Sequence, residues 1–212
     1  MIIEYLSSMA SQIAHVVYAT KYFEKYPLPN GEREEFILGS LFPDIRRIDE
    51  TIQRKDTHLR FEPLDLNFEG LDPFQSGWKF HLYCDMRREE ILNNHNFYLL
   101  KNTADFWHLS SKIFEDEIIY DDCDNWEKLV HYFNNVPDID VGTDVSRETF
   151  ELWYAIIAKY VETKPCSHSM KIFLSKQKNL ASIAKDILVS VNKLRKNAKV
   201  IEILKKVKEE IV

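Results

Sequence analysis

The fold is decided by residues 72–92, which read DPFQSGWKFHLYCDMRREEIL. Asp72 is a favoured N-cap residue, and Pro73 suits the first helical position because its missing N–H would have no helical partner there. The apolar residues that follow recur at helical spacing to the end of the stretch. These residues therefore predict a helix that carries His81 and Asp85 on one face, one turn apart.

Helical signals continue on both sides of this stretch. From apolar periodicity and chain breakers we expect further helices over residues 8–26, 32–43, 97–120, 125–135 and 146–162, with one or two more over 170–212. Residues 45–71 show little periodicity and predict a long loop, of a length that is usually functional. With only 5 glycines and 7 prolines in the chain, we expect an all-α fold of about seven helices.

The chain of 212 residues is long enough to bury a sizeable core. Its formal net charge of −6 is unevenly spread, because residues 171–212 hold 11 Lys/Arg and only 4 Asp/Glu. An apolar stripe at helical spacing runs through this basic segment from Leu180 to Ile201. We therefore expect a helical domain over residues 1–168, and a basic amphipathic helical extension over residues 169–212 that packs on it.

Composition and missing motifs exclude several classes of protein. No apolar run approaches the roughly 18 residues that span a bilayer, and the first nine residues carry no basic region typical of a secretory signal. Three widely spaced cysteines form no disulfide framework and no C-x-x-C zinc ribbon, so we expect a cytoplasmic protein. The net negative charge disfavours nucleic-acid binding, and no specific nucleic-acid partner is expected. The sequence also lacks P-loop, dinucleotide-binding and G-x-S-x-G motifs.

Polar residues that interrupt apolar segments are the candidates for chemistry. His15 lies in the apolar run AHVV of the first expected helix. Asp44 follows Pro43 and has the apolar residues Phe42 and Ile45 on either side of this pair. His58 lies in the long loop. Each has an ordinary structural interpretation: a core histidine bonded to backbone, a carboxylate that caps a turn, and a solvated loop histidine. A carboxylate near the core, however, needs a cation or several donors.

His81 and Asp85 give the strongest local signal. Their ordinary interpretation is an i,i+4 hydrogen-bonded pair on one helix face. Together with His15, Asp44 and His58, they supply nitrogen and oxygen ligands without nearby thiolates. Such a set is typical of a catalytic zinc site or of another divalent ion.

Four motifs in this order resemble the zinc-dependent phospholipase C family: His15, LGSLFPDI over residues 38–45, Thr57-His58, and GWKFHLYCD over residues 77–85. The resemblance covers about residues 8–90. It implies an all-α bundle with a metal site between its helices. In that family's arrangement His58, His81, Asp85 and Asp44 would surround one ion, and His15 with a bridging Asp85 would hold a second.

The sequence departs from the family after Asp85, where no H-x-x-x-E pair follows. We therefore expect one or two divalent ions, most simply zinc, instead of three. An ion with an open coordination position lowers the pKa of bound water toward about 7. Asp44 would orient or deprotonate this water, or bind the ion directly. Among the nearby arginines we expect Arg46 and Arg60 to bind phosphate oxygens, with Arg47 close to them in sequence.

These features predict a metal-dependent phosphoesterase that acts on a small-molecule or lipid phosphate ester. Peripheral membrane contact through the basic C-terminal helix is a further hypothesis. Two alternatives stay open. The first is a catalytically inactive helical binding protein derived from the same family. The second is an HD-type phosphohydrolase, although no histidine in this chain is followed directly by aspartate.

Overall fold

The computed structural model describes residues 11–100 and 107–212, and all regular secondary structure in these residues is helical, as predicted. The α-helices are α1 (Gln12–Lys25), α2 (Asn30–Leu41), α3 (Arg54–Thr57), α4 (Pro73–Asn94), α5 (Trp107–Ile119), α6 (Trp126–Phe133), α7 (Arg147–Val161), α8 (Ser167–Ser175), α9 (Ala184–Leu194) and α10 (Ala198–Glu210). The 3₁₀ helices are η2 (Phe42–Arg47), η3 (Phe97–Leu99), η4 (Tyr120–Asp122) and η5 (Ala181–Ile183).

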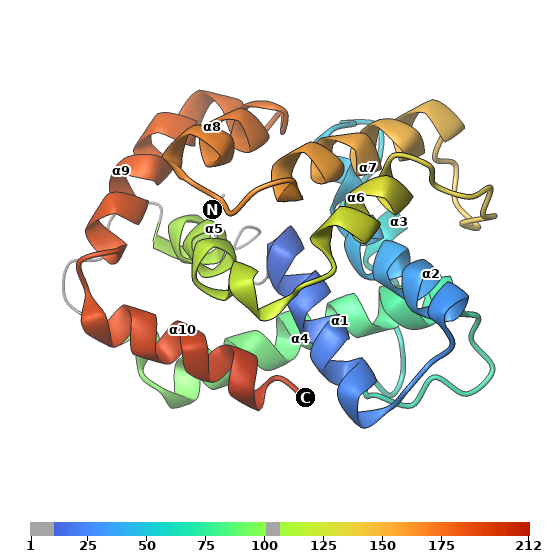
Figure 1. Ribbon diagram of the computed structural model, residues 1–212, viewed down its shortest axis with the longest axis horizontal. Helices are drawn as coiled ribbons and strands as arrows, with labels where there is room; N and C mark the ends of the chain where they lie inside the picture. Colours follow the sequence, from blue (N-terminus) through green and yellow to red (C-terminus); the bar gives the residue numbers. More distant parts are fainter. Residues whose placement is uncertain (1–10, 101–106) are drawn as a thin grey trace.

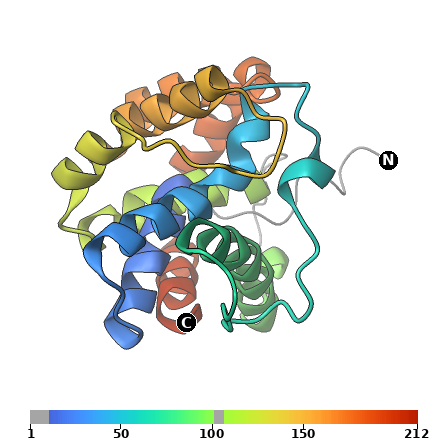
Figure 2. The same ribbon diagram turned by 90° about the vertical axis from the view of Figure 1, so that its right-hand side faces the viewer.

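Helix α1 lies in the middle of the molecule and contacts α2, α4, α5 and α10 (Figure 1). Helices α8, α9 and α10 run along one side of it, and α2, α6 and α7 lie on the other. Seen from that second side, α7 lies across the top above α2, and α4 lies below α2 (Figure 2). A central helix of this kind places its side chains in the core, and residues 11–19 of the chain are all buried.

Helices α2 and α4 pack closely because each carries a glycine where they cross. A Cβ atom at Gly39 would lie 1.9 Å from the backbone oxygen of Phe74, and one at Gly77 would lie 1.9 Å from that of Phe36. No side chain fits at either position, so the two backbones meet directly. This contact brings Ser40, near the end of α2, against the middle of α4.

The predicted start of α4 is confirmed in detail. The Asp72 side chain accepts a hydrogen bond of 2.8 Å from the backbone N–H of Gln75, and Pro73 is the first helical residue. The loop expected over residues 45–71 contains the end of η2 and the single-turn helix α3. Residues 8–10 of the first expected helix lie outside the described part of the chain.

The basic C-terminal segment forms three α-helices where one or two were expected. Helix α8 begins at Ser167, so a boundary between residues 168 and 169 falls inside a helix. Helices α9 and α10 pack on α5, and α10 also contacts α1 and α4. Their buried residues, among them Ile187 and Ile203, belong to the same hydrophobic cluster as those of α1. None of the described helices is long and apolar enough to cross a membrane.

Candidate metal centre

His15 from α1 and His81 and Asp85 from α4 converge in the core, and all three side chains are buried. One ligand atom from each lies within 4.8 Å of the others. Asp85 Oδ1 lies 3.6 Å from His15 Nε2, and Asp85 Oδ2 lies 3.4 Å from His81 Nε2. Within the described residues no other group of three or more such side chains is as close.

These separations match the geometry of a shared ion. Two atoms bound to one zinc at about 2.1 Å and at the tetrahedral angle lie about 3.4 Å apart. The His81 contact with Asp85 has this length, and the His15 contact is slightly longer than a hydrogen bond. The spacing therefore suits three ligands arranged around a cation.

The orientation of the His81 ring is fixed by α2. Its Nδ1 lies 2.8 Å from the backbone oxygen of Ser40. Because this carbonyl can only accept, Nδ1 carries a proton, and in the neutral ring Nε2 presents its lone pair toward Asp85. A backbone carbonyl on the second ring nitrogen is a usual support for a metal-binding histidine. His81 Nε2 and both ring nitrogens of His15 are buried without a hydrogen-bond partner among the described residues, an arrangement that is costly unless a ligand satisfies them.

Asp44 is buried in η2, where two side chains donate to its carboxylate. Gln12 Nε2 donates to Oδ2 at 2.7 Å, and Arg47 Nε donates to Oδ1 at 2.9 Å. Burial alone would raise the pKa of Asp44, but the charges of Arg47, His81 and Arg46 lower it to about 2. A carboxylate of such low pKa is a weak base. Its position therefore favours orienting a water molecule or binding an ion over abstracting a proton.

His58 follows α3 and lies beside His81, outside the three-residue group. Their ring centroids are 5.9 Å apart, and the rings are nearly perpendicular. Trp78 Nε1 donates to the backbone oxygen of Thr57 at 2.6 Å and so ties this end of α3 to α4. Nε2 of His58 is buried without a hydrogen-bond partner in the described residues. His58 is thus available as a further ligand at the edge of the centre.

The charge states at neutral pH suit metal binding. Burial, assisted by the charge of His81, lowers the pKa of His15 to about 4 and that of His58 to about 3. Burial would raise the pKa of Asp85, but His81 and His15 hold it well below its usual range. The pKa of His81 is raised, because Asp85 outweighs the effect of burial. His15 and His58 are thus neutral and Asp85 is ionised, which are the ligand forms that a divalent ion requires, whereas an ion that binds His81 must displace any proton from its Nε2.

The two arginines predicted to bind substrate lie in different surroundings. Arg46 is half-buried, and the carboxylates of Asp44 and Asp85 act on it while burial lowers its pKa. Arg60 is exposed and forms an ion pair with Glu62. Nothing in the described residues joins Arg60 to the centre.

Two supporting residues lie outside the segment that the motifs cover. The buried Lys112 of α5 lies near Asp85 and Asp44, whose charges act on its pKa. Gln177, after α8, accepts a hydrogen bond of 2.9 Å from Arg47. Neither residue carries a local signal, because each reaches the centre through tertiary contacts.

Comparisons of the chain with protein-family models, with curated proteins and with solved structures found no match. The function is therefore inferred from the geometry and chemistry of the centre.

Proposed function

We propose that the protein is a metal-dependent phosphoesterase in which His15, His81 and Asp85 hold a divalent ion, most simply zinc. The spacing of the two imidazole nitrogens from the two oxygens of Asp85, 3.6 and 3.4 Å, carries the proposal. A set of two histidines and one carboxylate is typical of catalytic zinc sites, which keep an open position, whereas structural sites are usually closed by cysteines.

A bound ion would supply two things: it would polarise a phosphoryl oxygen and lower the pKa of a bound water molecule. Asp44 stays ionised because Arg47 and Gln12 hold both of its oxygens, so it can accept a hydrogen bond from such a water. His58 offers a further neutral nitrogen, either to the same ion or to a second one. Burial of the ligands keeps bulk water from competing for these contacts. The substrate we propose is a small-molecule or lipid phosphate ester.

The metal content of the purified protein tests the first half of the proposal. Elemental analysis should find about one equivalent of divalent metal per wild-type chain and less than about 0.3 equivalents in His81→Ala. His131→Ala is the matched control, because His131 is exposed on α6. Equal metal content in all three proteins would refute the assignment.

Hydrolysis of p-nitrophenyl phosphate and of bis(p-nitrophenyl) phosphate tests the second half. Asp85→Asn should abolish turnover of whichever reporter the wild type accepts. A fully active His58→Ala/Asp85→Asn double variant would rule out this centre. A metal-loaded wild type that hydrolyses neither reporter would instead favour the inactive binding protein.

A further inference from the structure

The start of α1 presents two side chains to the metal centre. His15 faces Asp85, and Gln12 Nε2 donates to Asp44. Unlike the ring of His81, the ring of His15 has no hydrogen-bond partner for either nitrogen among the described residues. The place of the His15 ring therefore depends on where the backbone of α1 begins.

The start of α1 is capped by a side chain from another helix. Ser11 is the N-cap residue, but its hydroxyl makes no capping bond to α1 and instead donates to Asp116 Oδ2 at 2.6 Å. The backbone N–H of Ala14, in the first turn, donates to Asp116 Oδ1 at 3.0 Å. Asp116 lies in α5, and it provides the acceptor that the side chain of an N-cap residue usually provides.

The same carboxylate is also held by α7. The hydroxyl of Tyr160 donates to Asp116 Oδ2 at 3.0 Å. The ring of Tyr160 stacks on Phe173 of α8, with centroids 4.0 Å apart. Asp116 therefore joins the start of α1 to three other helices, and none of these bonds involves a residue of the metal centre.

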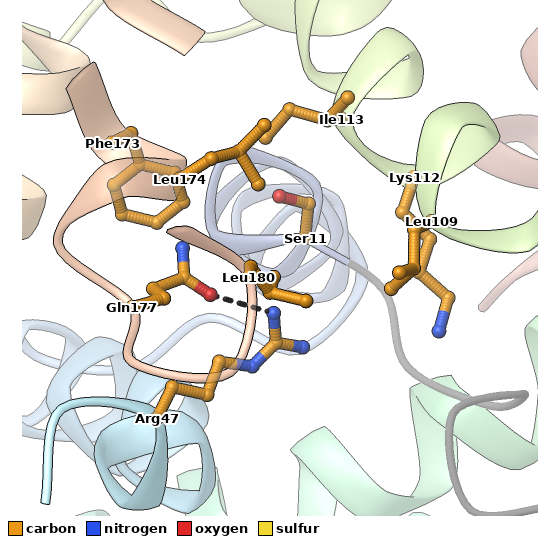
Figure 3. A pocket seen from close by; sticks show the side chains of 9 residues that line it. All are labelled: Ser11, Arg47, Leu109, Lys112, Ile113, Phe173, Leu174, Gln177 and Leu180. Carbon is orange, nitrogen blue, oxygen red and sulfur yellow. Dashed lines mark hydrogen bonds between the residues drawn. The ribbon is translucent and has the colours of Figure 1, made fainter. Parts of the chain in front are cut away.

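Packing alone supports the start of α1 incompletely. Ser11 borders a small cavity of about 20 Å³, and the side chains of Ile113 from α5 and Leu174 from α8 line it as well (Figure 3). A side chain beside unfilled space lacks the contacts that would otherwise hold it. The hydrogen bonds to Asp116 therefore contribute much to fixing this turn.

A carboxyl group at this place in the core is costly. Asp116 is fully buried, and burial raises its pKa to about 7, although the bonds from Ser11, Ala14 and Tyr160 act to lower it. The three donors thus offset only part of the cost of burial. An acidic residue buried at such a cost is a candidate for a functional role.

We propose that Asp116 is a positioning residue for the metal centre: its bonds to Ser11 and Ala14 fix the first turn of α1 and so hold the ring of His15 in place. The inference rests on the proposed function in one respect, because a metal ion is what the ring is held for. The bonds to Asp116 and the stacking of His15 on His81 are present without the ion.

NMR of the histidine rings in the full-length, EDTA-treated protein tests the proposal without metal. Because the rings of His15 and His81 are stacked, the ring current of His15 shifts the ring-proton resonances of His81. His15→Ala removes this ring and defines the full shift. In Asp116→Ala we expect the His81 resonances to move a large part of the way toward their positions in His15→Ala.

Two further variants show whether the bonds to α1 are responsible. In Asp116→Asn the amide oxygen can still accept from Ala14, and the amide nitrogen can donate to the hydroxyl oxygens of Ser11 and Tyr160. Tyr160→Phe is the matched control, because it removes a bond to the same carboxylate and leaves both bonds to α1. Both variants should keep the His81 resonances close to their wild-type positions. A shift in either one as large as in Asp116→Ala would overturn the proposal.

Zinc affinity, measured by competition with a chelating dye, tests the consequence for the centre. Asp116→Ala should lower the affinity at least about tenfold, as the loss of a residue that orients a metal ligand usually does. Tyr160→Phe should leave the affinity at the wild-type value. Thermal unfolding reports the stability of each variant separately. If Asp116→Ala loses stability but keeps the wild-type affinity and His81 resonances, Asp116 is merely structural and the proposal is overturned.

The two measurements separate this inference from the proposed metal centre. If the wild type binds no zinc while Asp116→Ala still shifts the His81 resonances, the metal proposal fails and the positioning role stands. If the wild type binds zinc and Asp116→Ala changes neither measurement, the positioning role alone fails. If Asp116→Ala does not fold, Ser11→Ala replaces it, because it removes one of the two bonds between Asp116 and α1. Ser11→Ala should then shift the His81 resonances in the same direction by a smaller amount, and unchanged resonances would overturn the proposal.

Discussion

The imidazole rings of His15 and His81 are stacked, with centroids 4.0 Å apart and an interplanar angle of 16°. One ring comes from α1 and the other from α4, and both are fully buried. Protonation of either ring opposes protonation of the other, and the charge of His81 is one of the causes that lower the pKa of His15. The stack is therefore stable with at most one proton charge, or with a cation that both neutral rings share.

Zinc should therefore stabilise the fold. At a free zinc concentration about 1,000 times the Kd, binding adds about 4 kcal/mol to the free energy of unfolding. In a chain of this size that corresponds to a rise in Tm of about 8–16 °C. Differential scanning fluorimetry in EDTA and in zinc measures it. His131→Ala should show the full shift and His81→Ala almost none; equal shifts in both would place the ion elsewhere.

The contribution of His15 to stability should depend on pH in a defined direction. Its pKa is about 4 in the folded protein, against 6.5 in the unfolded chain. The unfolded state therefore binds a proton first as the pH falls, and stability is lost between pH 6.5 and 4. The loss is about 3 kcal/mol for a shift of this size. The test is urea unfolding of the EDTA-treated wild type and of His15→Gln at pH 7 and pH 4. The wild type should lose more of its free energy of unfolding between these pH values than His15→Gln does. Equal losses in the two proteins would contradict the prediction.

The crossing of α2 and α4 should tolerate no side chain. Gly39→Ala and Gly77→Ala each place a Cβ 1.9 Å from a backbone oxygen, so the helices must separate. We expect each to lower the free energy of unfolding by about 3 kcal/mol or more. Gly31→Ala, in the first turn of α2, is the control, because a Cβ there has no neighbour within 4 Å. That substitution should be neutral or slightly stabilising, and a similar loss in all three variants would show that the crossing is not the cause.

Removing one partner of the buried ion pair between Arg88 and Glu115 should strongly lower the free energy of unfolding. Arg88 Nε donates to Glu115 Oε2 at 2.8 Å, and Tyr18 donates to the same carboxylate. Arg88→Met leaves a buried carboxylate without its cation and should cost about 3–5 kcal/mol. The double variant Arg88→Met/Glu115→Leu should recover much of the lost stability, because it leaves no unpaired carboxylate in the core. Chemical denaturation of the four proteins in the cycle measures the coupling, and additive losses would contradict it.

Any membrane contact of the C-terminal segment should be mainly electrostatic. Most apolar residues of α9 and α10, such as Ile187 and Ile203, face the core, with Val189 as an exposed exception. The exposed side chains also include Lys185, Lys193 and Lys205. Changing these three lysines to glutamine should lower binding to phosphatidylserine vesicles about 100-fold, at about 1 kcal/mol per lysine. Co-sedimentation at low and high salt measures it.

The control for this experiment changes three exposed lysines of the other helices and loops to glutamine: Lys55, Lys128 and Lys164. If this triple variant loses as much vesicle binding as the first one, the C-terminal segment has no special role. Deletion of residues 171–212 is unsuitable as a test, because it would remove part of the hydrophobic core.

Features that depend on neighbouring residues could be predicted from the sequence. The start of α4 follows from Asp72 and Pro73, and the shared face of His81 and Asp85 follows from their spacing. The approach of His15 to that face depends on how α1 packs against α4, which local sequence does not specify. It was expected from the combined set of nitrogen and oxygen ligands and from the family resemblance, and the described structure places His15 Nε2 3.6 Å from Asp85 Oδ1.

The breaks between α8, α9 and α10 could not be located from proline or glycine, since neither occurs after Pro165. One break had a local signal that periodicity obscured: the Asn197 side chain accepts hydrogen bonds from the N–H groups of Lys199 and Val200 and so caps α10. The other is set by packing, because the chain after α8 turns to bond Lys178 to the backbone of Arg47. A contact between residues so far apart leaves no trace in local composition.

The bond between Arg47 and Gln177 spans 130 positions of the chain. A ribosome releases the two histidines and the aspartate of the centre long before it reaches Gln177. During synthesis, the emerging chain therefore carries the candidate ligands while Arg47 still lacks one of the two side chains that hold it. The surroundings of Asp44 and Arg47 are complete only after Gln177 has been translated and has packed against them.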